Sequence, residues 1–193
     1  MKKLVYGKGH NDGSRPAKIA GKHLKEYSLW KGMLERCFCD KSKIKRPTYV
    51  GCTVSDNFLN YSYFYDWCQT QIGFGKQGWQ LDKDILITDN KIYGECTCAF
   101  VPRDINIFFI DRAKSRGDCS LGVHFNKRDG MYQSNCRVSG VLKHLGYYDT
   151  EQEAFLAYKP FKENLCKDLA LKCQSEIDPR VFQAMMNWQV QNN

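Results

Sequence analysis

The chain has 193 residues, of which 42% are hydrophobic and 26% charged, with 15 Gly and 5 Pro. This composition is ordinary for a globular protein and excludes collagen-like, coiled-coil and wholly disordered chains. No apolar run approaches the roughly 18–20 residues that a membrane span needs. The charged residues 1–8 are not followed by the apolar core of a secretory signal. We therefore expect one or two small domains, no membrane association and a cytoplasmic location.

The 29 Lys and Arg exceed the 21 Asp and Glu, and the excess is unevenly distributed. Residues 1–46 carry 13 basic and 4 acidic side chains (net +9), residues 47–111 carry 4 and 8 (net −4), and residues 112–143 carry 7 and 2 (net +5). Basic patches attract polyanions by releasing condensed counterions, so nucleic acid is the first partner to consider. The alternative is the solvated surface of a mildly basic protein.

The ten Cys, without a secretion signal, are expected to be thiols or metal ligands rather than a disulfide framework. Cys96 and Cys98 are separated by one residue, whereas structural zinc sites typically use pairs separated by two to four residues. A zinc site, the less favoured alternative, would use Cys37, Cys39, Cys52 and Cys68. We favour the interpretation that these Cys are small, buried hydrophobic side chains, as is usual for free Cys.

Residues 1–25 are rich in Gly, Lys and Ser, without periodicity, and predict a basic arm with little structure of its own. Apolar residues recur at helical spacing over 26–39, which predicts a helix. Its solvent side is expected to carry Lys25, Lys31 and Arg36.

Residues 40–48 predict a basic loop, and residues 49–54 a short strand. Asp56 is a plausible N-cap for a helix over 57–71. Its aromatic stripe is typical of a core-facing helix rather than of a cofactor site. The basic side chains of the loop are Lys41, Lys43, Lys45 and Arg46.

Residues 79–109 predict the order strand, turn, strand, helix. An apolar strand begins at Trp79, and Asp82 and Asp84 lie where it becomes polar. A turn follows at residues 89–91, then a return strand over 98–101. A short helix over 102–109 contains Asn106.

Residues 120–172 have the most regular pattern in the chain. Strands are expected over 121–125, 131–138 and 141–147, with an Asp-Gly hairpin turn between the first two. Thr150 and Glu153 match a capping box that opens a long helix. Pro160 lies within this helix and predicts a kink at a cost of about 3 kcal/mol. A final helix is expected around 180–190.

Alternation divides the central strand into two faces. The apolar face of the long helix needs a partner, so Tyr132, Ser134, Cys136 and Val138 are assigned to the core. The opposite face is rich in hydrogen-bonding groups and has no carboxylate. It comprises Gln133, Asn135 and Arg137, with His124 and His144 from the neighbouring strands and Lys127 and Arg128 at the turn. Arg pairs with guanine, and Asn or Gln with adenine, in the major groove. The alternative is the wet face of an ordinary sheet.

Residues 120–163 resemble the plant-type Apetala/ethylene-response DNA-binding domain. The matching motifs are Gly122-Val123, the Asp-Gly turn, the strand over 131–138, Leu145-Gly146-Tyr147 and the helix pattern that includes Ala157-Tyr158. Members of that family lay a three-stranded sheet in the DNA major groove. The resemblance implies that the base-facing positions are His124, Gln133, Asn135, Arg137 and His144. Relatives often carry Arg or Trp at the positions of the two His.

The segment over 27–106 resembles phage-encoded HNH homing-endonuclease-like proteins, through Tyr27, Trp30 and Arg36-Cys37, then the motif around Asp82-Lys83-Asp84. Such proteins often carry an Apetala-type domain behind the nuclease module. The resemblance implies a metal-binding ββα motif, but Lys83 stands where the family has its catalytic His. A Lys is a poor general base near neutral pH. Asp82, Asp84 and Asn106 are the catalytic candidates if activity survives, with Asp82 and Asp84 as Mg²⁺ ligands.

The sequence thus predicts an α+β protein: an HNH-like module with flanking helices, then a three-stranded antiparallel sheet packed on one long helix. The expected divisions are 1–25, 26–111, 112–175 and 176–193. The favoured function is sequence-specific binding of double-stranded DNA without a cofactor, as a phage-type repressor or site-blocking protein in the bacterial cytoplasm. In this hypothesis Lys18, Lys22 and Lys25 and the 41–46 segment contact phosphates. The alternatives are an active Mg²⁺-dependent homing or nicking endonuclease, and a protein-interaction module that sequesters a host or phage factor.

Overall fold

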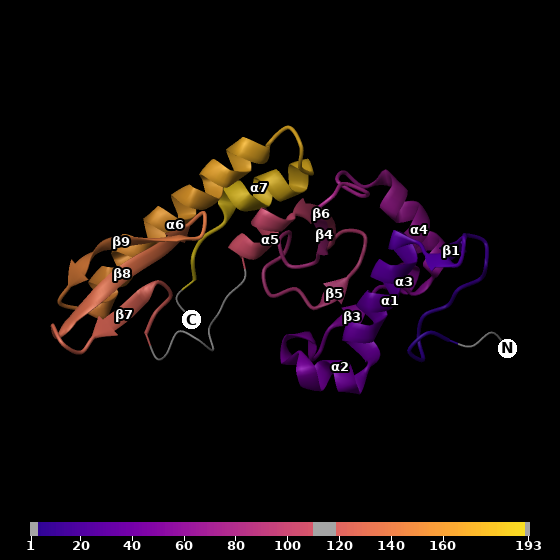
Figure 1. Ribbon diagram of the computed structural model, residues 1–193, viewed down its shortest axis with the longest axis horizontal. Helices are drawn as coiled ribbons and strands as arrows, with labels where there is room; N and C mark the ends of the chain where they lie inside the picture. The colour runs from indigo at the N-terminus through magenta and orange to yellow at the C-terminus, as the bar shows by residue number, and fades with distance from the viewer. Residues whose placement is uncertain (1–3, 110–118, 192–193) are drawn as a thin grey trace. The chain divides into compact units, whose positions relative to one another are not determined.

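A computed structural model describes residues 4–109 and 119–191 and has mixed α+β architecture (Figure 1). The chain divides into two compact units, one formed by residues up to 106 with 175–181, the other by 107–174 with 182–193. No helix in the described ranges is both long and apolar enough to cross a bilayer. Residues 110–118, which include part of the predicted basic segment 112–143, lie outside the described residues.

The first unit contains both helices and short strands. Its elements are β1 (Lys18–Ile19), β2 (Lys22–His23), α1 (Lys25–Phe38), α2 (Asp40–Lys45), the 3₁₀ turn η1 (Pro47–Tyr49), β3 (Thr53–Val54), α3 (Asp56–Leu59), α4 (Tyr61–Thr70), β4 (Trp79–Asp82), β5 (Ile92–Tyr93), β6 (Ala99–Pro102) and the start of α5 (Arg103–Phe108).

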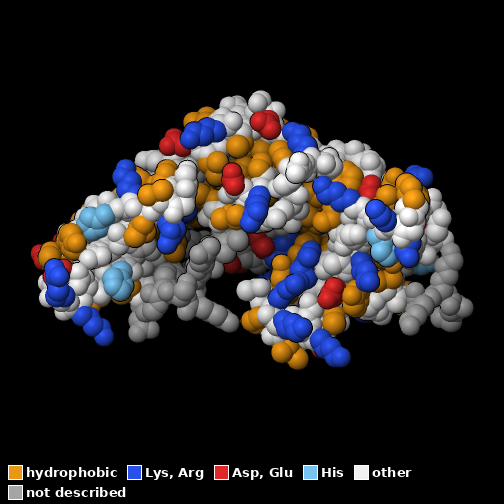
Figure 2. Space-filling model, in the orientation of Figure 1, with side chains coloured by type: hydrophobic (Ala, Val, Ile, Leu, Met, Phe, Trp, Pro, Cys, Tyr) orange, Lys and Arg blue, Asp and Glu red, His pale blue; other side chains and the backbone are white. Residues whose placement is uncertain are grey.

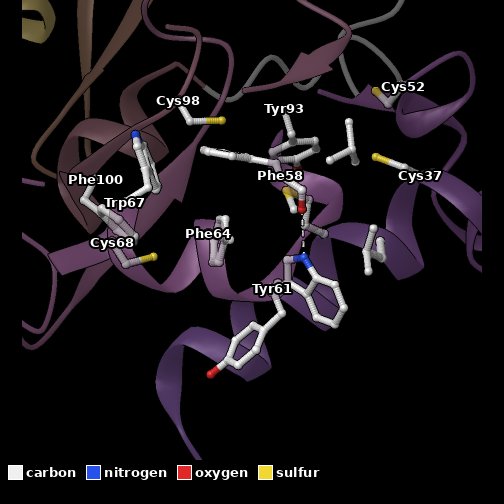
Figure 3. Close-up of a cluster of buried hydrophobic side chains, with 14 residues drawn as sticks. Cys37, Cys52, Phe58, Tyr61, Phe64, Trp67, Cys68, Tyr93, Cys98 and Phe100 are labelled. Atoms are coloured by element: carbon white, nitrogen blue, oxygen red, sulfur yellow. Dashed lines mark hydrogen bonds between the residues drawn. The ribbon is translucent and has the colours of Figure 1, made fainter. Parts of the chain in front are cut away.

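The core of this unit is a cluster of aromatic side chains (Figure 3). Trp30 of α1, Phe58 of α3 and Phe64 of α4 are fully buried. The Trp30 indole Nε1–H donates to the Phe58 carbonyl oxygen at 2.8 Å, so the one polar atom of this side chain is satisfied inside the core. The aromatic stripe is therefore core, as predicted.

The predicted single helix over 57–71 is wrong, because a second N-cap interrupts it. Ser55, not Asp56, caps α3 by accepting from the Phe58 backbone N–H. Asn60 then has extended backbone angles, and its Oδ1 accepts from the N–H groups of Ser62 and Tyr63. Asn side chains compete for backbone hydrogen bonds in this way, which favours a cap over a helix interior.

The N-terminal segment has little secondary structure but is tied to the helices. The backbone N–H of His10 donates to the Leu59 carbonyl at 2.8 Å, and the His10 carbonyl accepts from the backbone N–H of Tyr61 at 2.9 Å. Arg15 forms a bidentate pair with Asp66 of α4, at 2.6 and 3.0 Å. The described part of the predicted arm is thus a packed element of the first unit.

Two other local predictions differ from the structure. The predicted basic loop over 40–48 contains the helix α2 and the turn η1. The strand predicted over 49–54 is confined to Thr53–Val54, which pairs in parallel with Ile92–Tyr93. Pattern reasoning missed α2 because its six residues are too few to display a helical period.

The strand pair and the following helix predicted over 79–109 are confirmed, and the structure adds the two-residue strand β5 between the paired strands. β4 pairs antiparallel with β6, with Leu81 opposite Phe100 and Asp82 opposite Ala99, and α5 follows directly. The return strand is buried, since Ala99, Phe100 and Val101 are at most 1% exposed.

The second unit contains the predicted three-stranded antiparallel sheet, packed against one long helix. Its order is β7 (Val123–Asn126), β8 (Met131–Val138) and β9 (Val141–Tyr148), and the helix is α6 (Glu151–Cys173). The capping box is present, since Thr150 Oγ1 accepts from the Glu153 N–H and the Thr150 N–H donates to the Glu153 carboxylate. A further helix, α7 (Pro179–Asn187), falls where one was predicted.

The sheet and α6 bury Val123, Cys136, Ala154, Phe155 and Tyr158 between them. α6 continues through Pro160 as one helix. Pro160 is exposed, and Leu156, whose carbonyl loses its partner, is 56% exposed, so water can replace the missing hydrogen bond.

Candidate nucleic-acid interface

The β7–β9 sheet has one face turned toward α6 and one turned to solvent, as the alternation predicts. Ser134 and Cys136 are 0% and 3% exposed on the helix side, whereas Arg137 is exposed. We call the solvent side the outer face. Its members, from strand register, are His124 of β7, Gln133, Asn135 and Arg137 of β8, and Leu142, His144 and Tyr147 of β9. Histidine side chains lie over this sheet in Figure 2.

Register places the outer-face residues in rows across the strands. Gln133 is opposite His124 on one side and Tyr147 on the other, and Asn135 is opposite His144. A bulge between Ser134 and Asn135 shifts the register of β9. The bulge keeps His144 on the outer face and leaves Leu145 packed against the core.

One row is held by side-chain contacts. His144 Nδ1 lies 3.1 Å from Asn135 Oδ1, and the His144 ring lies 4.6 Å from the Tyr147 ring. Tyr147 is 51% exposed, so an aromatic ring stands beside the polar groups. Sequence reasoning did not include Tyr147 in the site, because simple alternation puts it on the same face as Leu145 and only the bulge brings it to the outer face.

Arg137 lies at the end of the sheet, beside the β8–β9 hairpin. Its Nη1 donates to the Gly140 carbonyl at 3.0 Å, which fixes one side of the guanidinium. The remaining donors have no protein partner within the described residues, and the opposing Leu142 is 58% exposed. Arg137 therefore presents hydrogen-bond donors next to an apolar side chain.

The β7–β8 turn carries Lys127 and Arg128, as predicted. Arg128 is 90% exposed and its Nε lies 3.0 Å from Asp129 Oδ1, while Asn126 Nδ2 also donates to Asp129. Asp129 reduces the positive charge of this turn but lies outside the strands. The outer face itself has no carboxylate.

The catalytic candidates of the β4–β6–α5 segment are engaged in local structure. Asp82 Oδ1 accepts from the N–H groups of Asp84 and Ile85 at 2.8 and 2.7 Å, and burial raises the pKa of the Asp82 carboxyl. Lys83 is 6% exposed and donates to the Asp84 carboxylate and to the Asn90 carbonyl. These contacts close the loop that follows β4.

Two asparagines complete this local arrangement. The Asn90 side-chain amide donates to the carbonyls of Lys83 and Ile92, each at 2.7 Å, so Asn90 joins both ends of the loop. Asn106 Nδ2 donates to Gln80 Oε1 at 2.6 Å, which ties α5 to β4. Within the described ranges, no three His, Cys, Asp or Glu side chains are grouped closely enough to hold a metal ion.

The candidate zinc ligands are mostly core side chains. Cys37, Cys52 and Cys68 are at most 3% exposed, and Cys37 and Cys52 are drawn within the cluster of Figure 3. Burial raises the pKa of the Cys37 thiol to about 12, as expected for a thiol that behaves as a small hydrophobic group.

The 41–46 segment forms a separate basic surface on the first unit. Lys41, Lys45 and Arg46 are exposed, and Lys43 lies 3.4 Å from Asp40. Figure 2 shows basic side chains grouped where Figure 1 places α2.

No protein-family model, curated protein or solved structure matches the chain.

Proposed function

We propose that this protein binds double-stranded DNA and reads its sequence with the outer face of the β7–β9 sheet. The observation that carries the proposal is the composition of that face. Arg, Asn, Gln and His side chains stand in register across three strands without a carboxylate, above a core that fixes the sheet. Arg, Asn and Gln are the side chains that form bidentate pairs with guanine and adenine.

The dimensions of a three-stranded sheet suit the major groove. Neighbouring strands are about 4.8 Å apart, so three strands span roughly 10 Å, against a groove width of about 12 Å. Alternate residues of a strand are about 6.7 Å apart, close to twice the 3.4 Å rise of a base pair. Gln133, Asn135 and Arg137 are alternate residues of β8, so successive members would meet base pairs two steps apart.

The resemblance of residues 120–163 to the Apetala/ethylene-response domain supports the same surface. In this proposal the α2 surface and the N-terminal lysines contact phosphates, and the protein acts as a repressor or site-blocking protein. The engagement of Asp82, Lys83 and Asn90 in loop hydrogen bonds supports a structural role for the segment that resembles an HNH nuclease.

Selection from a random duplex library, followed by footprinting on the selected site, tests the proposal. Arg137→Ala is expected to cost about 1–3 kcal/mol of specific binding and to relax preference at one position, if Arg137 contacts a guanine. Lys41→Ala is the control, because loss of a phosphate contact weakens binding to all sequences about equally. Unchanged sequence preference in Arg137→Ala would show that the outer face is not the reading surface.

The same footprinting experiment separates the alternatives. Strand cleavage in the presence of Mg²⁺ would favour an endonuclease. Affinity that falls steeply with salt is expected for a protein that neutralises phosphates. Indifference to duplex DNA at low salt would instead favour a protein-interaction module.

A further inference from the structure

Arg36 is a cation without an acidic partner in the described part of the chain. The sequence places it on the solvent side of α1, but its side chain is half-buried. Its Nε donates to the Tyr93 hydroxyl at 3.2 Å, and its guanidinium carbon lies 5.5 Å from the ring centroids of both Tyr49 and Tyr93. The two aromatic side chains therefore fix a guanidinium that no carboxylate neutralises.

The terminal nitrogens of Arg36 remain available. Neither donates to a protein acceptor among the described residues. Among those residues, Ser134 Oγ is the only side-chain nitrogen or oxygen that is both buried and without a hydrogen-bond partner, so the terminal nitrogens of Arg36 are not buried. The terminal nitrogens of Arg36 therefore reach solvent. A guanidinium that is held at Nε and open at its other end presents the fork that binds two oxygens of one anion.

Gly32 leaves room beside this open end. It lies within α1, one turn before Arg36, where Gly destabilises a helix relative to Ala. A Cβ built on Gly32 would meet only Arg36 Nη1, at 3.6 Å. The position thus has space for a side chain that it does not use, directly against the free edge of the guanidinium.

A second cation, Lys91, contacts the 3₁₀ turn η1. Lys91 is exposed, and its Nζ donates at 3.3 Å to the carbonyl of Thr48, the residue before Tyr49, whose ring contacts Arg36. The basic side chains of α2 precede the same turn. Positive charge therefore gathers around η1 from α1, α2 and the residue before β5.

We propose that Arg36, held by Tyr93 and Tyr49 and assisted by Lys91, is a binding site for one phosphate group. The ligand chemistry is a tetrahedral phosphate that offers two oxygens to the guanidinium fork and its remaining charge to the lysine. This site lies in the first unit and does not depend on the β7–β9 sheet, so it stands or fails separately from the proposed sequence reading. In a DNA complex it would hold the backbone without selecting bases.

The test uses the full chain, labelled with ¹⁵N, and follows the Nε–H resonance of Arg36. The resonance is assigned by its disappearance in Arg36→Lys. Inorganic phosphate, dimethyl phosphate and a 20-base-pair duplex are titrated in separate arms. We expect saturable shifts with inorganic phosphate. A matching response to the diester and the duplex identifies the nucleic-acid backbone as the source, whereas a response to inorganic phosphate alone identifies a site for free phosphate.

Two substitutions at Gly32 make the test specific. Gly32→Asp places a carboxylate one turn from Arg36, where it occupies the free edge, and should weaken phosphate binding at least tenfold. Gly32→Ala adds the Cβ alone and should bind within twofold of the original chain. Both should raise the melting temperature, because each replaces a helical Gly. Equal phosphate affinity of Gly32→Asp and Gly32→Ala would overturn the proposal.

A lysine pair provides an independent readout. Lys91→Gln should weaken phosphate binding several-fold, whereas Lys31→Gln, an equal change of charge at an exposed position of α1, should not. If duplex binding is detected, Lys91→Gln should also lower the slope of log affinity against log salt by about 0.9. Identical effects of the two substitutions would show nonspecific attraction and would overturn the site. Arg137→Ala should leave the Arg36 titration unchanged.

Discussion

Asn135 and His144 face each other across β8 and β9, with Asn135 Oδ1 3.1 Å from His144 Nδ1. When Nδ1 carries the proton, His144 donates to one lone pair of the amide oxygen. The Asn135 Nδ2 donors and the second lone pair of Oδ1 then remain for another partner. This is the donor–acceptor combination that pairs with the N7 and N6 atoms of adenine.

We expect Asn135→Ala to reduce discrimination at one base pair of the selected site by about 1–3 kcal/mol. His144→Ala should act at the same base pair with a smaller effect, because the imidazole orients the amide. Competition binding against single-base variants of the site measures both. Effects at unrelated base pairs would contradict the coupling of these two side chains.

The buried hydroxyl of Ser134 is expected to lower the stability of the second unit. Its hydroxyl is fully buried and has no hydrogen-bond partner among the described residues. Ser134→Ala removes a desolvated hydroxyl and should raise the free energy of unfolding by about 1 kcal/mol. Denaturant unfolding measures the change, and DNA affinity should stay the same because Ser134 faces α6. A loss of stability would indicate that the hydroxyl has a partner such as a buried water.

Gly122 is required by a close approach to α6. Its φ is +78°, and a Cβ at this position would lie 2.1 Å from Cδ2 of Tyr158. Gly122→Ala should therefore cost about 1–2 kcal/mol for the left-handed backbone and about 1–3 kcal/mol for the displaced ring.

Gly140 is the matched control for Gly122. Its φ is +84°, but a Cβ there would meet nothing within 4 Å. Gly140→Ala should cost only the backbone term of about 1–2 kcal/mol. Thermal or denaturant unfolding compares the two variants, and equal losses would mean that the Tyr158 ring yields without cost.

Asp82 provides a prediction with a pH dependence. Burial raises the pKa of its carboxyl above the ordinary value of 3.8, so the folded state favours the uncharged form. The contribution of this group to stability is present below pH 3.8 and is lost as the pH rises through the raised pKa. Asp82→Asn keeps an acceptor for the two backbone N–H groups and should lose that pH dependence. Its stability relative to the original chain should therefore increase from about pH 4 to pH 7.

Asp82→Ala is the companion substitution, because it removes the acceptor from the N–H groups of Asp84 and Ile85. It should cost about 1–2 kcal/mol relative to Asp82→Asn at any pH, because neither variant titrates at this position. Incubation of the original chain with its selected duplex and Mg²⁺ tests the endonuclease hypothesis at the same residue. Cleavage that both Asp82 variants abolish would assign a metal-binding role to Asp82.

The second unit was largely predictable because its determinants are local. The strict alternation over 131–138 decides which side chains face α6, and the Thr150–Glu153 capping box marks where that helix begins. Period-two alternation and a reciprocal cap each involve neighbouring residues, so a single sequence displays them. The β8 residues of the outer face and the α+β class follow from the same patterns, whereas the bulge that brings Tyr147 of β9 to that face does not.

Contacts between distant residues were decided only by the tertiary structure. The sequence pattern puts Arg36 on the solvent side of α1, but in the structure its Nε donates to the hydroxyl of Tyr93, 57 residues away. The N-terminal segment has no periodicity, yet His10 and Arg15 bind α3 and α4 across about 50 residues. Side-chain burial and charge pairing depend on which segments meet in space. The local period of the sequence determined the two faces of β8. Only the tertiary structure decided which charged side chains have a partner, because the partners come from distant parts of the chain.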